Sequence, residues 1–433
     1  MRASDAMEPL VFAILSARTP AHIERTLFDE RIEPVPLDLE TDLVAISVET
    51  FTARRAYQIA AAYRRRGVPV VMGGYHPTLL PDEVSRYCDV ICIGDAEGQW
   101  ERILSDAEAG SLGKRYHRER PPRLDEGPEP DRSIFAGKSY GMVFPLQFGR
   151  GCRYNCDFCS IRAVYGTDVR HRPHEAVLAE LPAHRQRRGK HLLAIVDDNL
   201  FTHPKPAAAL CEVLRPTGWH WVCQTSIKVA HDTGLVELMA ASGCVAVMMG
   251  FESLVPENLA VMNKRWNLGS GDYAQAIANL QRHGIMLYGS FIFGYDHDTP
   301  AVFARTVDFA IRNHLMLANF NLLTPTPGTP LIERLRGEGR LIHPQWWLDP
   351  YYRYGEAAFE PALMSREQLR DGCDWARRRF YSVSSAFRRG MHTPQLLRQP
   401  LRLGVFAAAN WVAGREVRRK RDSSFGEPGV SLS

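Results

Sequence analysis

Three cysteines stand close together with C-x3-C-x2-C spacing: Cys152, Cys156 and Cys159. Three thiolates on one short loop can ligate three irons of a cubane 4Fe–4S cluster, which normally takes four cysteine ligands. One iron then stays open, and a small chelating molecule can bind there. Gly149 and Gly151 precede the loop and let the backbone turn sharply around a bulky cofactor. The spacing therefore predicts a reactive cluster, against the alternative of three packing cysteines spaced by chance.

Alternating strands and helices must position this loop. From residue 141 the pattern predicts six β/α units, with strands at 142–148, 191–196, 219–225, 244–250, 285–293 and 317–323. Six units predict an incomplete barrel of the TIM type, whose reactive groups lie at the carboxyl ends of the strands. The cysteine loop follows the first strand. Polar residues follow later strands: Asp197 and Asp198, Glu252 and Ser253, and Thr324.

The cysteine spacing, with Phe158 before the third cysteine, resembles the radical S-adenosylmethionine (SAM) superfamily. In that family SAM chelates the open iron, and one electron from the cluster cleaves it to methionine and a 5′-deoxyadenosyl radical. The resemblance implies SAM contacts at four strand ends: Asp197 before Asp198 for the amino group, Glu252 and Ser253 for ribose and carboxylate, and Gly289, Ile292 and Thr324 around adenine. For Glu252 the alternative is a strand-end carboxylate that caps the next helix.

The first hundred residues also alternate. We expect strands at 10–16, 43–48, 68–72 and 90–93 and helices at 20–29 and 53–66, which predicts a small parallel α/β sheet. Its strand ends resemble the cobalamin-binding domain that precedes many radical SAM domains. The resemblance implies corrin contacts from Ser47, Gly73, Gly74, His76, Gly94 and Glu97. The Asp-x-His-x-x-Gly motif is absent, which implies a cobalt without a histidine ligand from that motif.

Two questions about this domain stay open. It is short before residue 43, so it is either a working cobalamin-binding domain or a relic of one. His76 either contacts the cofactor or caps its own loop.

We predict four segments: a cobalamin-binding-like Rossmann-type domain at 8–110, a linker at 111–137, a radical SAM barrel at 138–340 and a helical extension at 341–433. Pro and Gly enrichment marks the linker. The extension carries Trp346 and Trp347 and resembles that of lipid-acting relatives such as the hopanoid methylases. Its aromatic residues either close the barrel mouth or belong to a helical cap over the open barrel edge. Residues 422–433 are predicted to be disordered.

The composition and charge of the chain limit its expected location in the cell and its expected binding partners. The chain has 433 residues and a net charge of +4, which predicts no bulk affinity for nucleic acid. Nine cysteines without a signal peptide favour a reducing cytoplasm. No run reaches the roughly 18–20 apolar residues of a membrane span. The segment 400–421, apolar and then basic, is either a docking helix or a peripheral contact with the inner face of a membrane.

These patterns and resemblances predict a cytoplasmic enzyme that uses a 4Fe–4S cluster, SAM and cobalamin. The expected reaction is C-methylation of an unactivated carbon in a lipid-like or secondary-metabolite substrate. Two alternatives remain: a radical SAM oxidative cyclase or rearrangement enzyme without methyl transfer, and a non-catalytic Fe–S redox or sensing protein. Such an enzyme needs an electron donor, such as flavodoxin or ferredoxin. No side chain is assigned as the catalytic residue, and the substrate is not named by the sequence.

Overall fold

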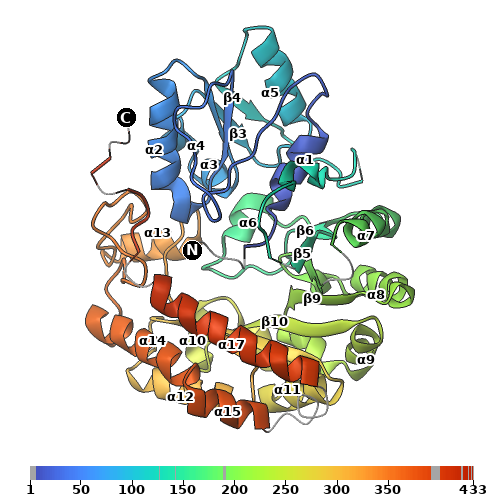
Figure 1. The fold of residues 1–433 in the computed structure, drawn as a ribbon. Coiled ribbons are helices and arrows are strands. Elements are labelled where there is room, and N and C mark those ends of the chain that lie inside the picture. The colour runs from blue at the N-terminus through green and yellow to red at the C-terminus, as the bar shows by residue number, and fades with distance from the viewer. Residues whose placement is uncertain are drawn as a thin grey trace.

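The computed structural model of the chain describes residues 6–125, 127–141, 143–188, 192–391, 400–420, 423–427, 429–430 and 432. It contains two parallel sheets, a four-stranded sheet above a six-stranded one in the view of Figure 1. The short antiparallel pair β6 (Gly149–Arg150) and β7 (Arg170–His171) lies where the two domains meet. The predicted α/β class with two parallel sheets is confirmed.

The upper sheet has the order β1-β2-β3-β4, with every neighbouring pair parallel. Its strands are β1 (Val44–Ser47), β2 (Val70–Gly73), β3 (Val90–Ile93) and β4 (Arg115–His117). Its helices are α2 (Ala53–Arg64), α3 (Tyr75–Leu79), α4 (Pro81–Val84) and α5 (Gln99–Glu108). The middle strands are buried on both faces, as the continuous apolar sequences of parallel strands require.

Three expectations for the N-terminal part were wrong. The run at 10–16 forms helix α1 (Leu10–Ala17), which packs against Phe135 and Tyr140. A short, continuous apolar run suits a buried helix as well as a strand, so periodicity alone could not decide. No helix forms at 20–29. Within the predicted linker, β4 extends the sheet and η2 (Arg132–Phe135) packs on α1.

The lower sheet has the order β12-β11-β10-β9-β8-β5 and is parallel throughout. The strands are β5 (Val143–Leu146), β8 (Leu192–Ile195), β9 (His220–Thr225), β10 (Cys244–Glu252), β11 (Met286–Phe293) and β12 (Leu317–Leu322). The helices that connect or follow these strands are α6 (Ser160–Tyr165), α7 (His174–Arg188), α8 (Pro204–Leu214), α9 (Thr233–Ala241), α10 (Pro256–Val261), α11 (Tyr273–Arg282), α12 (Ala301–Arg312) and α13 (Pro330–Gly337). β5 and β12 are its two edges, so the sheet is an open, six-unit barrel.

The two faces of this sheet differ in burial. On β10, Val247 and Met249 are buried beneath the helices, whereas Met248 between them is only half-buried. On β11, Ser290 and Ile292 alternate in the same way with buried neighbours. Alternation along each strand therefore leaves the concave face accessible to ligands.

The helical extension covers the barrel edge. Helix α14 (Arg366–Phe380) lies against β12 and α12, and Cys373 Sγ donates to Phe320 O at 3.1 Å. Of the two roles considered for the extension, these contacts favour the helical cap. Helices α15 (Val383–Met391) and α17 (Pro400–Lys420) continue this cover (Figure 1). None of the helices in the described ranges is long and apolar enough to span a bilayer.

The aromatic residues of the extension do not close the barrel mouth. Trp346 and Trp347 are buried in the core of the upper domain instead. Phe425 packs against Phe51 and Tyr352, with ring centroids 5.7 and 5.6 Å away. The prediction of disorder was therefore wrong around Phe425, while residues 422, 428, 431 and 433 lie outside the described ones.

Candidate cofactor and active site

The two carboxylates after β8 hold the start of the cysteine loop. Asp197 Oδ1 accepts a hydrogen bond from the backbone N–H of Phe148 at 2.8 Å, and Asp198 Oδ2 accepts one from Gly151 at 2.8 Å. Burial raises the pKa of Asp197 to about 7 and also raises that of Asp198. Both predicted SAM contacts thus lie against the loop, and in this arrangement each supports its backbone.

The middle of the loop is anchored to the opposite side of the barrel. The backbone N–H of Asp157 donates to Met262 O at 3.1 Å, and its C=O accepts from Leu331 N–H at 3.0 Å. Tyr295 OH donates to the Asp157 carboxylate at 2.7 Å. Residues from the segments that follow β10, β11 and β12 therefore fix the segment between the second and third cysteines.

The three thiols lie close enough to influence one another electrostatically. Burial raises the pKa of Cys156 to about 12 and that of Cys159 to about 11, and the neighbouring cysteines contribute to both shifts. Asn199 Nδ2 donates to Cys152 Sγ at 3.7 Å, and Lys264 stabilises the Cys156 thiolate. No three His, Cys, Asp or Glu side chains in the described ranges close on a single metal ion. Three thiolates on one loop fit a cubane, which carries each thiolate on a different iron.

Glu252 occupies the end of β10 in a conformation rare for a non-glycine residue, with φ of 61°. Its buried carboxylate pairs with Lys264 Nζ at 2.7 Å, and the same ammonium donates to Gly250 O at 2.9 Å. Ser253 Oγ accepts from Val255 N–H at 3.1 Å. Glu252 does not cap α10, so the helix-cap alternative fails for it. Backbone strain of this kind is concentrated at ligand and active sites.

The predicted adenine contacts divide between two faces of the sheet. Ile292 lies on the accessible face, and Thr324 lies just beyond β12, where its hydroxyl donates to Leu322 O at 3.2 Å. Gly289 lies on the face that packs against the helices. A Cβ at Gly289 would approach the Leu315 side chain to 2.6 Å, so a larger residue here would require that side chain to shift. Side chains alternate between the two faces along β11, so Gly289 and Ile292 lie on opposite faces.

Four predicted corrin contacts gather at the carboxyl edge of the upper sheet: Ser47, Gly73, Gly74 and Gly94. Ser47 pairs with Gly73 across β1 and β2. Thr78 Oγ1 donates to Gly74 O at 2.8 Å and accepts from Gly94 N–H at 2.9 Å, which joins the two turns. Gly94 has φ of 78°, and a Cβ there would meet no atom within 4 Å. The open space beside Gly94 fits the approach of a large planar cofactor.

His76 is fully buried and has no free ring nitrogen. Nε2 lies 3.0 Å from Tyr57 OH and 3.1 Å from Glu83 Oε1, and Nδ1 lies 3.2 Å from Thr50 Oγ1. These contacts favour the loop-holding role over a contact between its side chain and the cofactor.

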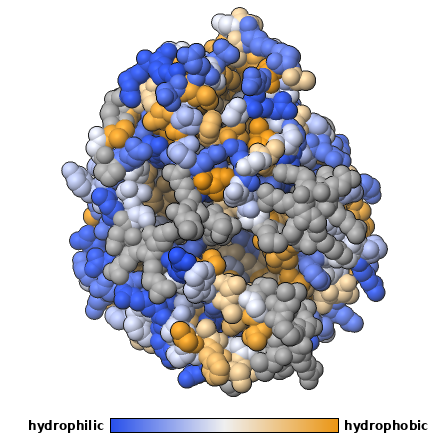
Figure 2. Space-filling view, viewed as in Figure 1, coloured by the Kyte–Doolittle hydropathy of each residue, from blue (hydrophilic) through white to orange (hydrophobic). Residues whose placement is uncertain are grey.

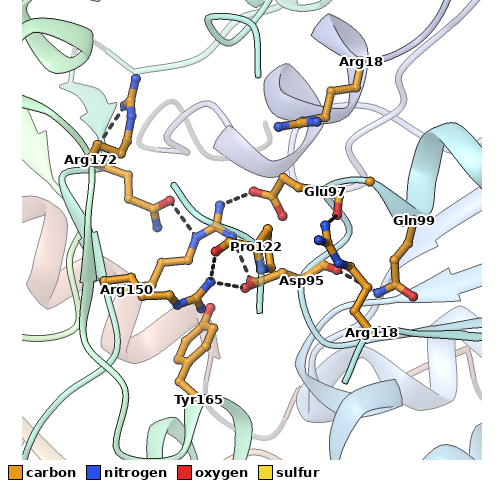
Figure 3. A network of polar contacts seen from close by, with 12 residues as sticks. Arg18, Asp95, Glu97, Gln99, Arg118, Pro122, Arg150, Tyr165 and Arg172 are labelled. Carbon is orange, nitrogen blue, oxygen red and sulfur yellow. Dashed lines mark hydrogen bonds and ion pairs between the residues drawn. The ribbon is translucent and has the colours of Figure 1, made fainter. Parts of the chain in front are cut away.

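The Glu97 side chain takes part in an ion pair between the two domains. It pairs with Arg150 at 2.6 Å, and Arg150 reaches Asp95 at 2.8 Å (Figure 3). Arg170 binds the same aspartate at 2.7 Å. Burial opposes these charges, yet Glu97 and Asp95 hold the pKa of Arg150 above its usual range. We call Arg150, Arg170, Asp95 and Glu97 the charged interdomain contact, because it joins the upper domain to the strands β6 and β7.

Three residues of the interdomain space were missed as individual site residues. Tyr75 OH donates to Tyr165 OH at 3.3 Å, linking the turn after β2 to α6 beside the cysteine loop. Glu49 is solvent-accessible but surrounded by protein, which raises its pKa to about 7. Glu49 and Tyr75 lie within two residues of the predicted contacts Ser47 and Gly74. Tyr165 lies in a short helix without a distinctive motif.

Comparison with known proteins agrees with this architecture. The radical SAM superfamily model matches residues 146–310, and the B12 binding domain model matches residues 19–104. Bacteriochlorophyllide d C-12(1)-methyltransferase of Chlorobaculum tepidum is 32% identical over 394 residues, covering 89% of this chain and 85% of the relative. The chain belongs to the cobalamin-dependent radical SAM methylases.

Two further matches extend this assignment. Hopanoid C-2 methylase of Rhodopseudomonas palustris is 26% identical, covering 78% of this chain and 66% of the relative. The fold matches that of the cobalamin-dependent SAM radical enzyme OxsB with a TM-score of 0.66 at 16% identity, covering 95% of this chain and 70% of that one. The predicted enzyme class and the three cofactors are confirmed at the level of the family, and the cyclase and sensor alternatives are not favoured.

Proposed function

We propose that this enzyme methylates an unactivated carbon of a large, mostly apolar substrate of the bacteriochlorophyllide type. The observation that carries this proposal is the match over 85% of the length of a bacteriochlorophyllide d methyltransferase. The accessible concave face supports it, because Met248 and Ile292 give apolar contact area while Ser290 and Asn321 give polar contacts there. Apolar walls with few polar groups are typical of small-molecule sites.

In this proposal Cys152, Cys156 and Cys159 hold the cluster, and Glu252 and Ile292 adjoin SAM. When bound, the cofactors supply the radical that removes a hydrogen atom and the methyl group that replaces it. The protein chain positions these cofactors. The side chains around the cysteine loop hold its backbone, and the glycine turns of the upper sheet let a flat cofactor approach.

The test is an anaerobic incubation of the reconstituted enzyme with bacteriochlorophyllide d, reductant, cobalamin and methyl-labelled SAM. We expect one labelled methyl group in the chlorin and release of 5′-deoxyadenosine. A Cys152→Ala variant should lose both products, and omission of cobalamin should remove the methylated product. Release of 5′-deoxyadenosine without label in the chlorin would reject the substrate class, and a hopanoid precursor tested in parallel would identify the lipid alternative.

We also propose that the enzyme meets its apolar substrate at a membrane surface. On α15 Val383, Phe387 and Met391 are 88%, 68% and 49% exposed, and their i, i+4, i+8 spacing places them on one face. On the neighbouring α17, Trp411 is 61% exposed, with Arg415 4.5 Å from its ring centroid. Hydrophobic atoms are visible in the lower part of the surface in Figure 2. An apolar face bordered by cations suits an anionic bilayer interface.

Vesicle sedimentation tests this location. Wild-type protein should sediment with vesicles that contain anionic phosphatidylglycerol and less with neutral phosphatidylcholine vesicles. Phe387→Glu should abolish the difference, whereas Leu363→Glu, at a residue 53% exposed outside these helices, should retain it. Equal sedimentation of the two variants would reject the membrane contact.

A further inference from the structure

Three exposed cations surround the outer side of the cysteine loop. Arg153 lies in the loop itself, Lys228 lies in η5 (Ile227–His231), and Arg265 begins η6 (Arg265–Ser270). Within the part of the chain that the structure describes, none of the three forms an ion pair, although Arg150, Arg170 and Arg172 do. Exposed cations without carboxylate partners leave a locally positive surface.

Two stacked aromatic rings lie at the centre of these cations. Tyr154 of the loop stacks on Trp266 with ring centroids 3.7 Å apart and an angle of 12° between planes. Lys228 Nζ lies 5.5 Å from the Tyr154 ring centroid and 5.4 Å from that of Trp266, and Arg153 lies 5.9 Å from the Tyr154 centroid. We call Arg153, Tyr154, Lys228, Arg265 and Trp266 the basic platform.

Carboxylates on neighbouring elements do not neutralise this platform. Asp232 accepts from Leu235 N–H at 3.0 Å as the N-cap of α9, and Asp272 accepts from Ala274 N–H at 2.9 Å as the N-cap of α11. Glu252 is buried against Lys264 at 2.7 Å. Each of these anions contacts another group, and among the described residues none forms an ion pair with a platform cation.

We propose that the basic platform is the docking surface for a small acidic one-electron carrier protein of the flavodoxin or ferredoxin kind. The inference rests on the proposed function, because it presumes a cluster on Cys152, Cys156 and Cys159. Arg153 and Tyr154 lie between the first two of these cysteines, so a partner on the platform would contact the loop that holds the cluster. One electron passes from the reduced carrier to the cluster, and no bond or proton is exchanged.

Charge and shape agree with such a partner. Transient redox complexes are small, and electrostatic steering supplies much of their association rate. An aromatic centre with a rim of cations matches the usual anatomy of an interface. The rival occupant is an anionic group of the substrate, and the experiment separates the two.

The decisive variant is the double substitution Lys228→Glu/Arg265→Glu, which leaves the cysteine loop intact. Its matched control is Lys205→Glu/Arg305→Glu, which makes the same charge change on α8 and α12, at exposed residues away from the platform. The cluster-loaded proteins are titrated with oxidised flavodoxin by calorimetry at two salt concentrations. We expect at least about a tenfold weaker affinity and a smaller salt dependence for the platform variant only.

Chemical reduction separates this proposal from the proposed function. With dithionite, both double variants should release 5′-deoxyadenosine as fast as wild type and retain iron and cobalamin. Equal flavodoxin affinity in the two double variants would overturn the docking surface. Normal flavodoxin affinity with a raised KM for substrate would assign the platform to the substrate. Absence of 5′-deoxyadenosine from dithionite-reduced wild type would reject the proposed function, while the flavodoxin titration would still report on docking.

Discussion

Two contacts attach the cobalamin-binding domain to the barrel, and they are built differently. The charged interdomain contact joins Asp95 and Glu97 to Arg150, which stands two residues before Cys152. On the other side Trp346 and Trp347 of the extension enter the core of the upper domain. We call these two tryptophans, with Tyr352, Phe51 and Phe425, the aromatic interdomain contact.

Both indole N–H groups of the aromatic contact have hydrogen-bond partners in the protein. Trp346 Nε1 donates to Pro325 O at 2.8 Å, and Trp347 Nε1 donates to Glu83 Oε1 at 3.0 Å. Tyr57 OH also donates to that carboxylate, at 2.9 Å. Within the described part of the chain the hydrogen bonds of these buried indoles reach Pro325 and Glu83 and not the cysteine loop, so we expect them to contribute mainly to stability. Arg150 instead transmits the position of the upper domain to the loop, so we expect it to affect the coupling of the cofactors.

The largest loss of stability is expected for Trp346→Ala. Removing a buried indole leaves a cavity and an unpaired Pro325 carbonyl, which costs about 3–5 kcal/mol. Denaturant unfolding followed by circular dichroism measures this loss. Trp375→Ala, at a residue 44% exposed on α14, should change stability by less than about 0.5 kcal/mol. A Trp346 variant as stable as the Trp375 variant would refute a stabilising role for the aromatic contact.

Arg150→Met should lower stability by about 3 kcal/mol, because it leaves the buried Glu97 carboxylate without its cation while Asp95 keeps Arg170. It should also loosen the alignment of the two domains, so that more 5′-deoxyadenosine is released for each methyl group transferred. Product ratios and spectra of bound cobalamin measure this second effect. Adding Glu97→Gln to Arg150→Met should restore stability but not the product ratio. An unchanged ratio in Arg150→Met would show that the charged contact only stabilises.

The sequence could predict features that depend on local patterns, and it could not predict contacts between distant segments such as those of the two interdomain contacts. The six barrel strands could be located because each is a short apolar run followed by polar residues, as at Asp197 and Glu252. The cysteine loop could be recognised from spacing alone. The partners of Glu97 and His76 could not be predicted, because both motifs fit a cofactor turn and only the packing of distant segments decides what each side chain meets.

The predictions for the N-terminal helix and for the extension were wrong for the same reason. The run beginning at Leu10 is apolar enough for a strand, and its packing against the distant Phe135 is not visible in its own sequence. Trp346 looked suited to a barrel mouth because aromatic residues are common there. Its burial in another domain depends on contacts between distant segments, such as that between Glu83 and the neighbouring Trp347, which are 264 positions apart in the chain.

Acid should weaken the charged contact in a defined range of pH. Burial opposes ionisation of Glu97, but Arg150 prevails and holds its pKa below the usual 4.5. The ionised carboxylate therefore contributes stability that is complete above about pH 4.5 and is lost as pH falls through the lower native pKa. Glu97→Gln should cost about 1–3 kcal/mol at pH 7 and progressively less below pH 4.5. A cost that does not change with pH would mean that the charge of Glu97 is not what stabilises the contact.

The smallest effect is expected at the uncharged hydrogen bond between the two domains. Tyr165→Phe removes one hydroxyl that accepts from Tyr75 at 3.3 Å, and a neutral hydrogen bond of this kind contributes about 0.5–1.5 kcal/mol. The ring keeps its place, so stability should fall by no more than this amount. Because both tyrosines lie between the turn after β2 and the cysteine loop, cobalamin affinity should fall as well, while iron content should not. Tyr75→Phe supplies the matched partner: if the two hydroxyls act through each other, the double variant should bind cobalamin no more weakly than either single one, whereas additive losses would assign each hydroxyl its own contact with the cofactor.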